Sequence, residues 1–291
     1  MDRSSILEVR SQVQQVQAEL QARSRYLAER GLVPQLFLLQ IGDQEADRAY
    51  AASLERKGRQ LGIEVRKPKQ TLSPERPEQA LTLVRELNCD PQLDGILLLR
   101  PLEDSALERE LCQALSQTRD VDVCNPETLG RFYAGLHDEA PCTAEACLRF
   151  LRYLDYDCRG KQVLIVGRSP VVGRPLAELF LRAQAAVSLV HSQSTGSREL
   201  VQTQDLVVLA AGRRQLPLLD HLRSGQLVLD VGIHSGPDGQ LQGDADAEEL
   251  IARGISVSAV PGGVGALTSL ILLERVIRRA ETRLLAGAQD L

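Results

Sequence analysis

The chain has 291 residues and a net charge of −5, so it is long enough for one large or two ordinary domains and carries no overall basic charge that would attract nucleic acid. It contains neither the apolar core of a signal peptide nor an apolar run long enough to cross a bilayer, so we expect a cytoplasmic protein without a membrane partner. Six scattered cysteines without a C-x-x-C pair favour reduced thiols, and the four histidines lack metal-ligand spacing, so we expect no metal site.

The first half of the chain alternates helical and extended patterns. Residues 5–30 carry apolar residues at helical spacing and predict one long helix. Because strand and helix patterns then follow one another, we expect a parallel sheet. The predicted strands are 34–41, 63–65 and 94–99, and the predicted helices are 44–61, 75–88 and 103–116.

The alternation resumes after residue 160 and predicts a small Rossmann-like unit, with a domain junction near 141–155. A last helix at about 266–286 is too long for a simple cap, and we expect it to return to the first domain. Its arginines at 275, 278 and 279 fit a solvated helix face. The predicted strands are 161–166, 186–190, 205–209, 227–231 and 256–260, and the predicted helices are 171–183, 196–203 and 246–253.

The most informative stretch is the glycine-containing segment 167–175, which joins a β-branched apolar run to a helical pattern. Strand, glycine turn and helix together set backbone N–H groups against phosphate oxygens, which indicates a dinucleotide. The spacing differs from G-x-G-x-x-G, so a tight turn without a ligand is the alternative.

Three further segments each allow two interpretations. The glycine-rich 261–265 segment permits close approach by a flat ligand or simply leads into a helix. A carboxylate of Asp120-Val121-Asp122 either caps a turn or binds the N–H edge of a heterocycle. Tyr50 either belongs to the core or presents its ring to a ligand.

Taken together, these segments resemble the bifunctional methylenetetrahydrofolate dehydrogenase/cyclohydrolase family. The resemblance spans nearly the whole chain in the same order, and its two glycine-rich segments are the specific ones. The matching positions are Ile41-Gly42-Asp43 leading to Tyr50, Asp94-Gly95-Ile96-Leu97, Asp120-Val121-Asp122, Gly130-Arg131, Pro141-Cys142-Thr143, Gly167-Arg168-Ser169-x-x-Val172-Gly173-x-Pro175, His191-Ser192, Asp230-Val231-Gly232-Ile233, Gly243-Asp244 and Pro261-Gly262-Gly263-Val264-Gly265.

The resemblance implies an α/β fold with two domains and a cleft between them. An N-terminal catalytic, folate-binding domain would cover 1–145 and be completed by the C-terminal helix, 266–291, and a Rossmann-type NAD(P)-binding domain with a parallel sheet would cover 146–265. The implied activity is hydride transfer from methylenetetrahydrofolate to the nicotinamide, giving methenyltetrahydrofolate. The implied partners are a tetrahydrofolate derivative and a second copy of the chain in a homodimer.

Family roles carry over by position. Tyr50 would stack on the folate and Asp122 would bind the pterin ring, which makes these two the candidate catalytic residues. Arg168 and Ser192 would grip a 2′-phosphate and so favour NADP, while Gln193, where the family often has a basic residue, leaves NAD open. The full cofactor set would be Thr143, Gly167, Arg168, Ser169, Gly173, Ser192 and Ile233, and the folate set would add Leu54, Leu99, Pro261, Gly262, Gly263, Val264 and Gly265.

The chain departs from the family at the acid/base positions. The family pattern Y-x-x-S-K places its lysine where this chain has Leu54, and the partner glutamine is replaced by Leu99. Hydride transfer depends on position and orientation, whereas adding water to the methenyl cation and opening the ring requires proton transfers. We therefore predict a dehydrogenase with weak or absent cyclohydrolase activity.

Other changes leave alternatives open. Lys57 is either a displaced substitute for the lysine or a solvated side chain, and Arg100 is expected to point to the sheet face opposite Leu99. The segments Val123-Cys124-Asn125-Pro126 and Ala266-Leu267-Thr268 replace family G-F-H-P and P-M-T beside the implied folate site. A folate or nucleotide binder without turnover and a dehydrogenase for another substrate are therefore the alternative functions.

Overall fold

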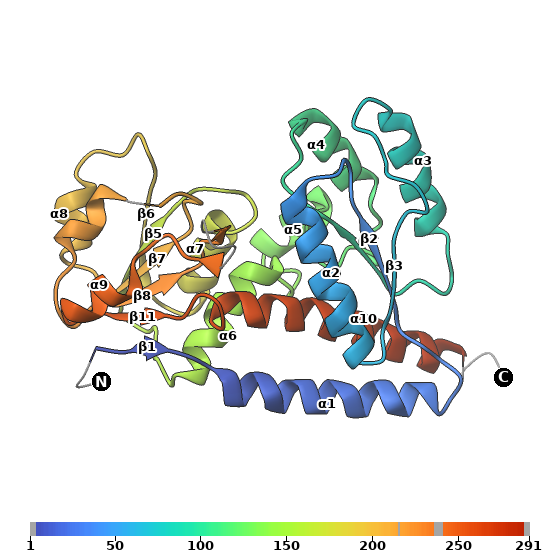
Figure 1. Ribbon diagram of the computed structural model, residues 1–291, viewed down its shortest axis with the longest axis horizontal. Coiled ribbons are helices and arrows are strands. Elements are labelled where there is room, and N and C mark those ends of the chain that lie inside the picture. Colours follow the sequence, from blue (N-terminus) through green and yellow to red (C-terminus); the bar gives the residue numbers. More distant parts are fainter. Residues whose placement is uncertain (1–3, 215, 236–240, 288–291) are drawn as a thin grey trace. The chain divides into compact units, whose positions relative to one another are not determined.

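The computed structural model describes residues 4–214, 216–235 and 241–287. It divides into two compact units, each with its own parallel sheet (Figure 1). The six-stranded unit comprises 1–13 and 140–268, and the three-stranded unit comprises 14–139 and 269–291. The α/β fold class with a Rossmann-like sheet is thus confirmed.

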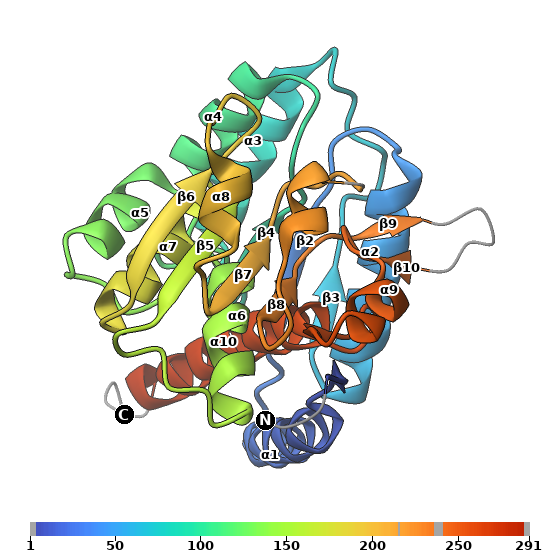
Figure 2. The same cartoon turned by 90° about the vertical axis from the view of Figure 1, so that its left-hand side faces the viewer.

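The six-stranded sheet has the order β1-β11-β8-β7-β5-β6, and all of its pairings are parallel (Figure 2). Its central strands are runs of Val, Leu and Ile buried on both faces, as expected for a sheet covered by helices on each side. The strands are β1 (Ile6–Leu7), β5 (Gln162–Val166), β6 (Ala186–Val190), β7 (Leu206–Leu209), β8 (Leu227–Asp230) and β11 (Ser256–Ser258), and a small hairpin pairs β9 (His234–Ser235) with β10 (Leu241–Gln242). The helices are α6 (Cys142–Tyr153), α7 (Gly173–Arg182), α8 (Ser197–Val201), α9 (Ala247–Ala252) and a 3-10 turn, η1 (Pro217–His221).

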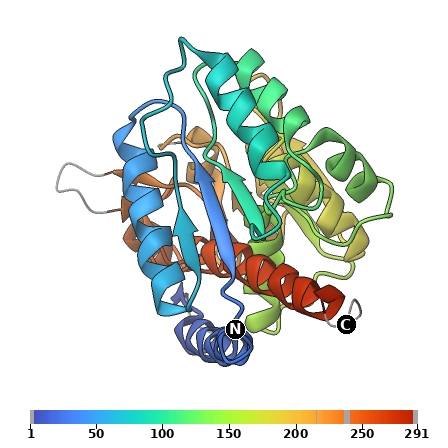
Figure 3. The ribbon, with the colours of Figure 1, turned by 90° about the vertical axis from the view of Figure 1, so that its right-hand side faces the viewer.

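The three-stranded sheet has the order β3-β2-β4, again parallel (Figure 3). Two of its helices begin at side-chain caps: Asp104 accepts N–H bonds at the start of α4, and Asn125 does so at the start of α5, followed by Pro126. The strands are β2 (Gln35–Leu39), β3 (Glu64–Arg66) and β4 (Gly95–Leu98), and the helices are α2 (Glu45–Gln60), α3 (Pro77–Asn88), α4 (Ser105–Ala114) and α5 (Pro126–Tyr133). Helices α1 (Arg10–Ala28) and α10 (Val264–Gly287) each have their first turn in the six-stranded unit.

Several expected boundaries differ from the structure. The single helix expected over 5–30 is strand β1 followed by α1, because residues 6–7 pair with β11. The expected junction at 141–155 is largely helix α6, and helix α5 was not predicted. The compact units accordingly change over between residues 139 and 140, where the sequence suggested domains of 1–145 and 146–265.

The solvated face expected for the arginines of α10 is wrong. Arg275 is only 2% exposed; its Nη1 donates to the carbonyl oxygen of Val121 at 2.9 Å. Arg279 is largely buried and donates to the carbonyl oxygen of Asp120 at 2.7 Å. Of the three, only Arg278 is substantially exposed, with a side chain 49% accessible.

Two acidic side chains pair with arginines of α10. Glu139 pairs with Arg278 and lies 3.7 Å from Nε of Arg275. Asp94, which is 1% exposed, accepts two hydrogen bonds from Arg283, at 2.9 and 2.8 Å. Because a buried charge is costly unless it is paired, these contacts fix how α10 lies within the three-stranded unit.

Among the residues that the structure describes, no helix is both long and apolar enough to span a membrane. Within the same ranges, no group of three or more His, Cys, Asp and Glu side chains could hold a metal ion.

The turn that follows helix α7 contains a backbone position that favours glycine. Gln184 has φ +61°, its side chain is exposed, and its N–H donates to Leu181. Because a left-handed conformation costs an L-residue about 1–2 kcal/mol, Gln184→Gly should raise the free energy of unfolding by about 1 kcal/mol. Urea denaturation measures this change. Gln184→Ala, which keeps the Cβ, should give no such gain, and equal effects of the two substitutions would contradict the explanation.

Candidate functional site

The glycine turn lies at the point where the six-stranded sheet reverses its strand order. Strand β5 has β6 on one side and β7 on the other. Gly167 follows β5 with φ +130°, and a Cβ there would lie 2.2 Å from the carbonyl oxygen of Ala210, just after β7. Open parallel sheets bind ligands outside the carboxyl ends of their strands at this kind of switch point.

The second glycine brings the start of α7 against the turn. A Cβ on the buried Gly173 would lie 2.1 Å from the carbonyl oxygen of Gly167, so only glycine fits without a shift of the backbone. The hydroxyl of Ser169 accepts the N–H of Val172 at 3.1 Å and closes the turn. The turn therefore presents the positive end of α7 where a diphosphate can approach closely, so the residues present fit a dinucleotide.

A basic and polar edge follows β6. The Arg168 side chain is exposed, and its Nη1 lies 3.4 Å from Nε2 of His191. Ser192 is also exposed, and the run 191–196 contains no carboxylate. A carboxylate near this point typically binds the ribose 2′-hydroxyl of NAD, whereas an arginine accommodates a 2′-phosphate.

The structure brings Ile233 to the glycine-rich segment 261–265. Ile233 is 60% exposed, and a Cβ built on Gly265 would lie 3.7 Å from its Cδ1. In the same segment Gly263 has no room for a side chain, because its Cβ would lie 2.3 Å from the carbonyl oxygen of Ala259. Val264 and Gly265 form the first turn of α10, so the segment is both a tight turn and a helix start.

The loop that carries Ile233 is held by a buried carboxylate. Asp230 accepts the N–H groups of Gly232, Asp244 and Ala245 at 2.9–3.1 Å. Burial raises the pKa of Asp230, although these backbone donors oppose the rise. The expected cofactor residue Thr143 lies apart in the chain, in the first turn of α6, where it is half-buried.

In the three-stranded unit, the acid/base positions are closed. Tyr50 on α2 is 37% exposed, but Leu54, one turn further along, is fully buried. Leu99 is 3% exposed and extends the β4 ladder by donating its N–H to Leu39. Lys57 is half-buried, so it is not simply a solvated side chain. Burial, together with the charge of Arg56, lowers the pKa of its ammonium. Among the described residues, this ammonium has no hydrogen-bond or ion-pair partner.

The two carboxylates of the 120–122 segment have different surroundings. Asp120 is buried and accepts the N–H of Asn125 at 2.8 Å and that of Asp122 at 3.1 Å, so it shapes the turn. Asp122 instead pairs with Arg100, whose Nη2 lies 2.9 Å from Oδ2. In the same turn Val123 has φ +53°, a strained backbone for a β-branched residue, where the family pattern has glycine.

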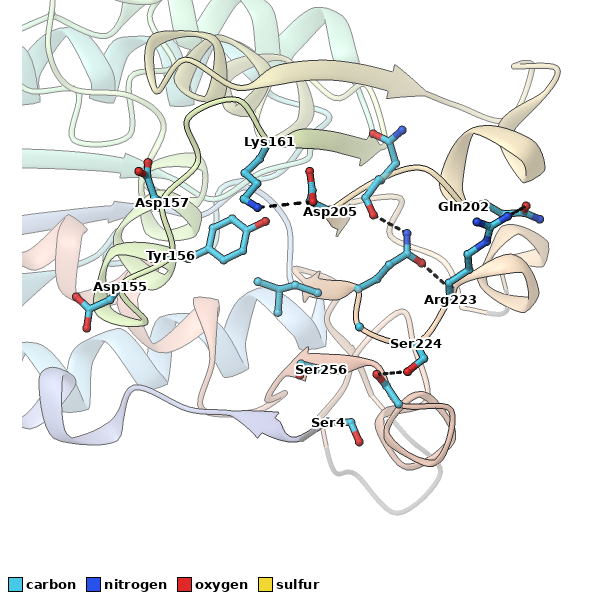
Figure 4. A pocket seen from close by; sticks show the side chains of 15 residues that line it. Ser4, Asp155, Tyr156, Asp157, Lys161, Gln202, Asp205, Arg223, Ser224 and Ser256 are labelled. Atoms are coloured by element: carbon cyan, nitrogen blue, oxygen red, sulfur yellow. Dashed lines mark hydrogen bonds and ion pairs between the residues drawn. The ribbon is translucent and has the colours of Figure 1, made fainter. Parts of the chain in front are cut away.

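A separate hollow of about 1060 Å³ lies at the other end of the six-stranded sheet (Figure 4). Lys161, Asp205 and Gln226, which line it, immediately precede β5, β7 and β8. It is therefore at the amino ends of the strands, away from the switch point, and is not the candidate nucleotide site.

Comparisons with known proteins match this arrangement over most of the chain. Residues 7–122 match the tetrahydrofolate dehydrogenase/cyclohydrolase catalytic domain, and residues 141–284 match the NAD(P)-binding domain of the same enzymes. The bifunctional protein FolD of Campylobacter hominis is 34% identical over 92% of this chain and 94% of its own. The chain belongs to the tetrahydrofolate dehydrogenase/cyclohydrolase family.

Solved structures of family members have the same fold. The bifunctional enzyme FolD of Campylobacter jejuni superposes with a TM-score of 0.88 at 29% identity, covering 96% of this chain and 99% of its own. The Trypanosoma brucei methylenetetrahydrofolate dehydrogenase-cyclohydrolase, solved with NADP and an inhibitor, has a TM-score of 0.86 at 25% identity, covering 97% and 99%. The predicted family membership is therefore confirmed.

Arg100 was not among the residues expected to form the site. It was expected to point to the sheet face opposite Leu99, yet it pairs with Asp122, the residue expected to bind the pterin. Its signal was present in the sequence, since a charged residue stands where the family pattern D-G-I-L-V-Q-L-P has leucine.

The close packing of Gly173 gives a direct test of the turn. Gly173→Ala should destabilise the protein by about 1–3 kcal/mol and weaken binding of a nicotinamide cofactor, because the new methyl group displaces the Gly167 carbonyl. Thermal unfolding and cofactor titration measure the two effects. The matched control is Gly130→Ala, where a Cβ meets nothing within 4 Å; a similar loss in this variant would contradict the packing argument.

Proposed function

We propose that this chain oxidises methylenetetrahydrofolate to methenyltetrahydrofolate with NADP. The observation that carries the proposal is the Gly167–Gly173 turn at the sheet's switch point, in a chain of this family. A purified-protein assay with methylenetetrahydrofolate and each nicotinamide cofactor tests it. Appearance of reduced nicotinamide is expected, and no turnover with either cofactor would refute it.

The residues of the six-stranded unit would hold the cofactor, which supplies the hydride acceptor when bound. The positive end of α7 and the turn closed by Ser169 would lie against the diphosphate. Arg168 and Ser192 would bind the ribose 2′-phosphate, and the exposed Ile233 would pack against the ring system. These groups bind and orient the cofactor. Hydride transfer itself requires no proton transfer by a side chain.

The three-stranded unit would bind the folate. Tyr50 offers a partly exposed ring for stacking, and Asp122 offers a carboxylate that accepts N–H bonds from the pterin. By analogy with the family, we also assign a folate-binding role to the glycine-rich segment, Pro261–Gly265. Orientation of the methylene carbon by these contacts supplies the main catalytic effect of the protein.

We propose that cyclohydrolase activity is weak, because Leu54 and Leu99 replace the two polar groups of the family pattern and are both buried. Neither side chain can transfer a proton. Lys57 has the lowered pKa of a partly desolvated amine, but it lies about one helical turn beyond Leu54. We therefore expect hydrolysis of methenyltetrahydrofolate close to the uncatalysed rate.

Restoring the polar pair should restore the second activity. The double variant Leu54→Lys/Leu99→Gln should raise the rate of methenyltetrahydrofolate hydrolysis by about 10²–10⁴, the usual contribution of one acid/base group. The decay of methenyl absorbance measures it. The matched control, Leu54→Gln/Leu99→Gln, is polar but has no proton to transfer at neutral pH. An equal gain in the control, or rapid hydrolysis by the unmodified protein, would contradict the assignment.

The exposed Arg168 should decide the cofactor preference. Loss of a charge-assisted hydrogen bond to the 2′-phosphate in Arg168→Gln should raise the Kd for NADP by about 10- to 100-fold. The Kd for NAD, which lacks this phosphate, should change much less. Fluorescence titration with both cofactors measures the ratio. Parallel weakening of NADP and NAD would show that Arg168 does not read the 2′-phosphate.

Calorimetric titration with NADP, NAD and a folate, combined with the turnover assay, distinguishes two other functions. A regulatory binder would bind cofactor and folate without turnover, whereas a dehydrogenase for another substrate would bind cofactor but not folate. The changes beside the folate-binding positions, at Val123–Asn125, bear on both alternatives. We also propose a cytoplasmic homodimer by analogy with the family, which sedimentation of the purified protein would test.

A further inference from the structure

Arg100 and Asp122 form a largely buried ion pair beyond the carboxyl end of β4. Their side chains are 10% and 18% exposed, and Nη2 lies 2.9 Å from Oδ2. Arg100 follows β4 by two residues, and Asp122 follows Asp120, which bridges to Ile96 of the same strand. Both side chains therefore belong to the end of a parallel sheet where ligands bind.

The guanidinium is not satisfied by the protein. Its Nε is buried and has no hydrogen-bond partner among the described residues. The neighbouring thiols of Cys112 and Cys124 are weak acceptors and do not replace an oxygen. Because an unpaired buried donor costs free energy, a nine-tenths buried arginine with an orphan N–H indicates a missing acceptor.

The pair has the chemistry to bind a ring amide. Guanidinium N–H groups donate to a carbonyl oxygen, and a carboxylate has enough lone pairs to accept a ring N–H while it is paired with Arg100. Adjacent C=O and N–H groups occur at the edge of a 2-amino-4-oxopteridine. A 4-amino group at the same place would set donor against donor.

We propose that Arg100 is a specificity-determining residue that, with Asp122, binds the C=O/N–H edge of the substrate ring and selects 4-oxo over 4-amino pterins. This inference rests on the proposed folate site. It assigns to Arg100 a role that is separate from hydride transfer, so binding and turnover test the two proposals independently.

Calorimetric titration of the NADP-saturated protein with tetrahydrofolate and with tetrahydroaminopterin, its 4-amino counterpart, tests the assignment. The unmodified protein should prefer the 4-oxo compound, and Arg100→Leu should reduce this preference by about 10- to 100-fold, the effect of one charge-assisted hydrogen bond. Arg100→Lys keeps the charge but loses the planar fork and should retain only part of the preference. It also provides a reading if the leucine variant does not fold.

Arg66→Leu is the matched control. Arg66 lies in the same unit and pairs with Asp90 at the same distance, 2.9 Å, but takes no part in the proposed site. It should leave the preference unchanged. A folded Arg100→Leu or Arg100→Lys protein with the full preference would overturn the role of Arg100 while dehydrogenase turnover still stood. Absence of both tetrahydrofolate binding and turnover in the unmodified protein would overturn this inference together with the proposed function.

Discussion

The buried arginines of α10 hold the segment on which the proposed folate site depends. Arg275 and Arg279 donate to the carbonyl oxygens of Val121 and Asp120, so the backbone leading to Asp122 is fixed from outside its own loop. Arg283 holds Asp94 immediately before β4. Since each guanidinium is costly to bury without its partner, small changes in the register of α10 would leave several charges unpaired at once. The backbone at Asp120 and Val121 is therefore held by a helix that is distant in the sequence.

The nucleotide side depends on a different constraint, the absence of side chains. Gly167 and Gly173 allow a strand end, a turn and a helix start to approach within distances that a Cβ would not permit. This backbone packing brings the start of α7 to the end of β5 without committing any titratable residue. The turn keeps both close-packed glycines, whereas buried leucines, Leu54 and Leu99, stand at the positions where the family pattern has lysine and glutamine. In our proposal, the two activities of the family therefore rest on separate features of the chain.

Local sequence signals predicted most of the sheet because its strands are short β-branched and aliphatic runs ended by turns. Strand β6 was predicted at its observed bounds, 186–190. Helix α5 was not predicted although Asn125 and Pro126 form a recognisable cap and first turn, because a helix of 8 residues is too short to show a clear apolar period. Helix α6 occupies the expected domain junction, and its inward face, including Phe150 and Leu151, is buried in the six-stranded unit.

The sequence by itself determined the fold class, the family, the glycine turn and the loss of the lysine and glutamine. Each of these can be recognised from contiguous residues or from single positions within a motif. It did not determine which charges meet. Arg100 and Asp122 are 22 residues apart, and Arg275 is 154 residues from Val121, so both contacts exist only after the chain has returned to the same sheet edge. Tertiary structure decided these pairings because burial makes an arginine take whichever acceptor the packed backbone places beside it, and no local pattern specifies that acceptor.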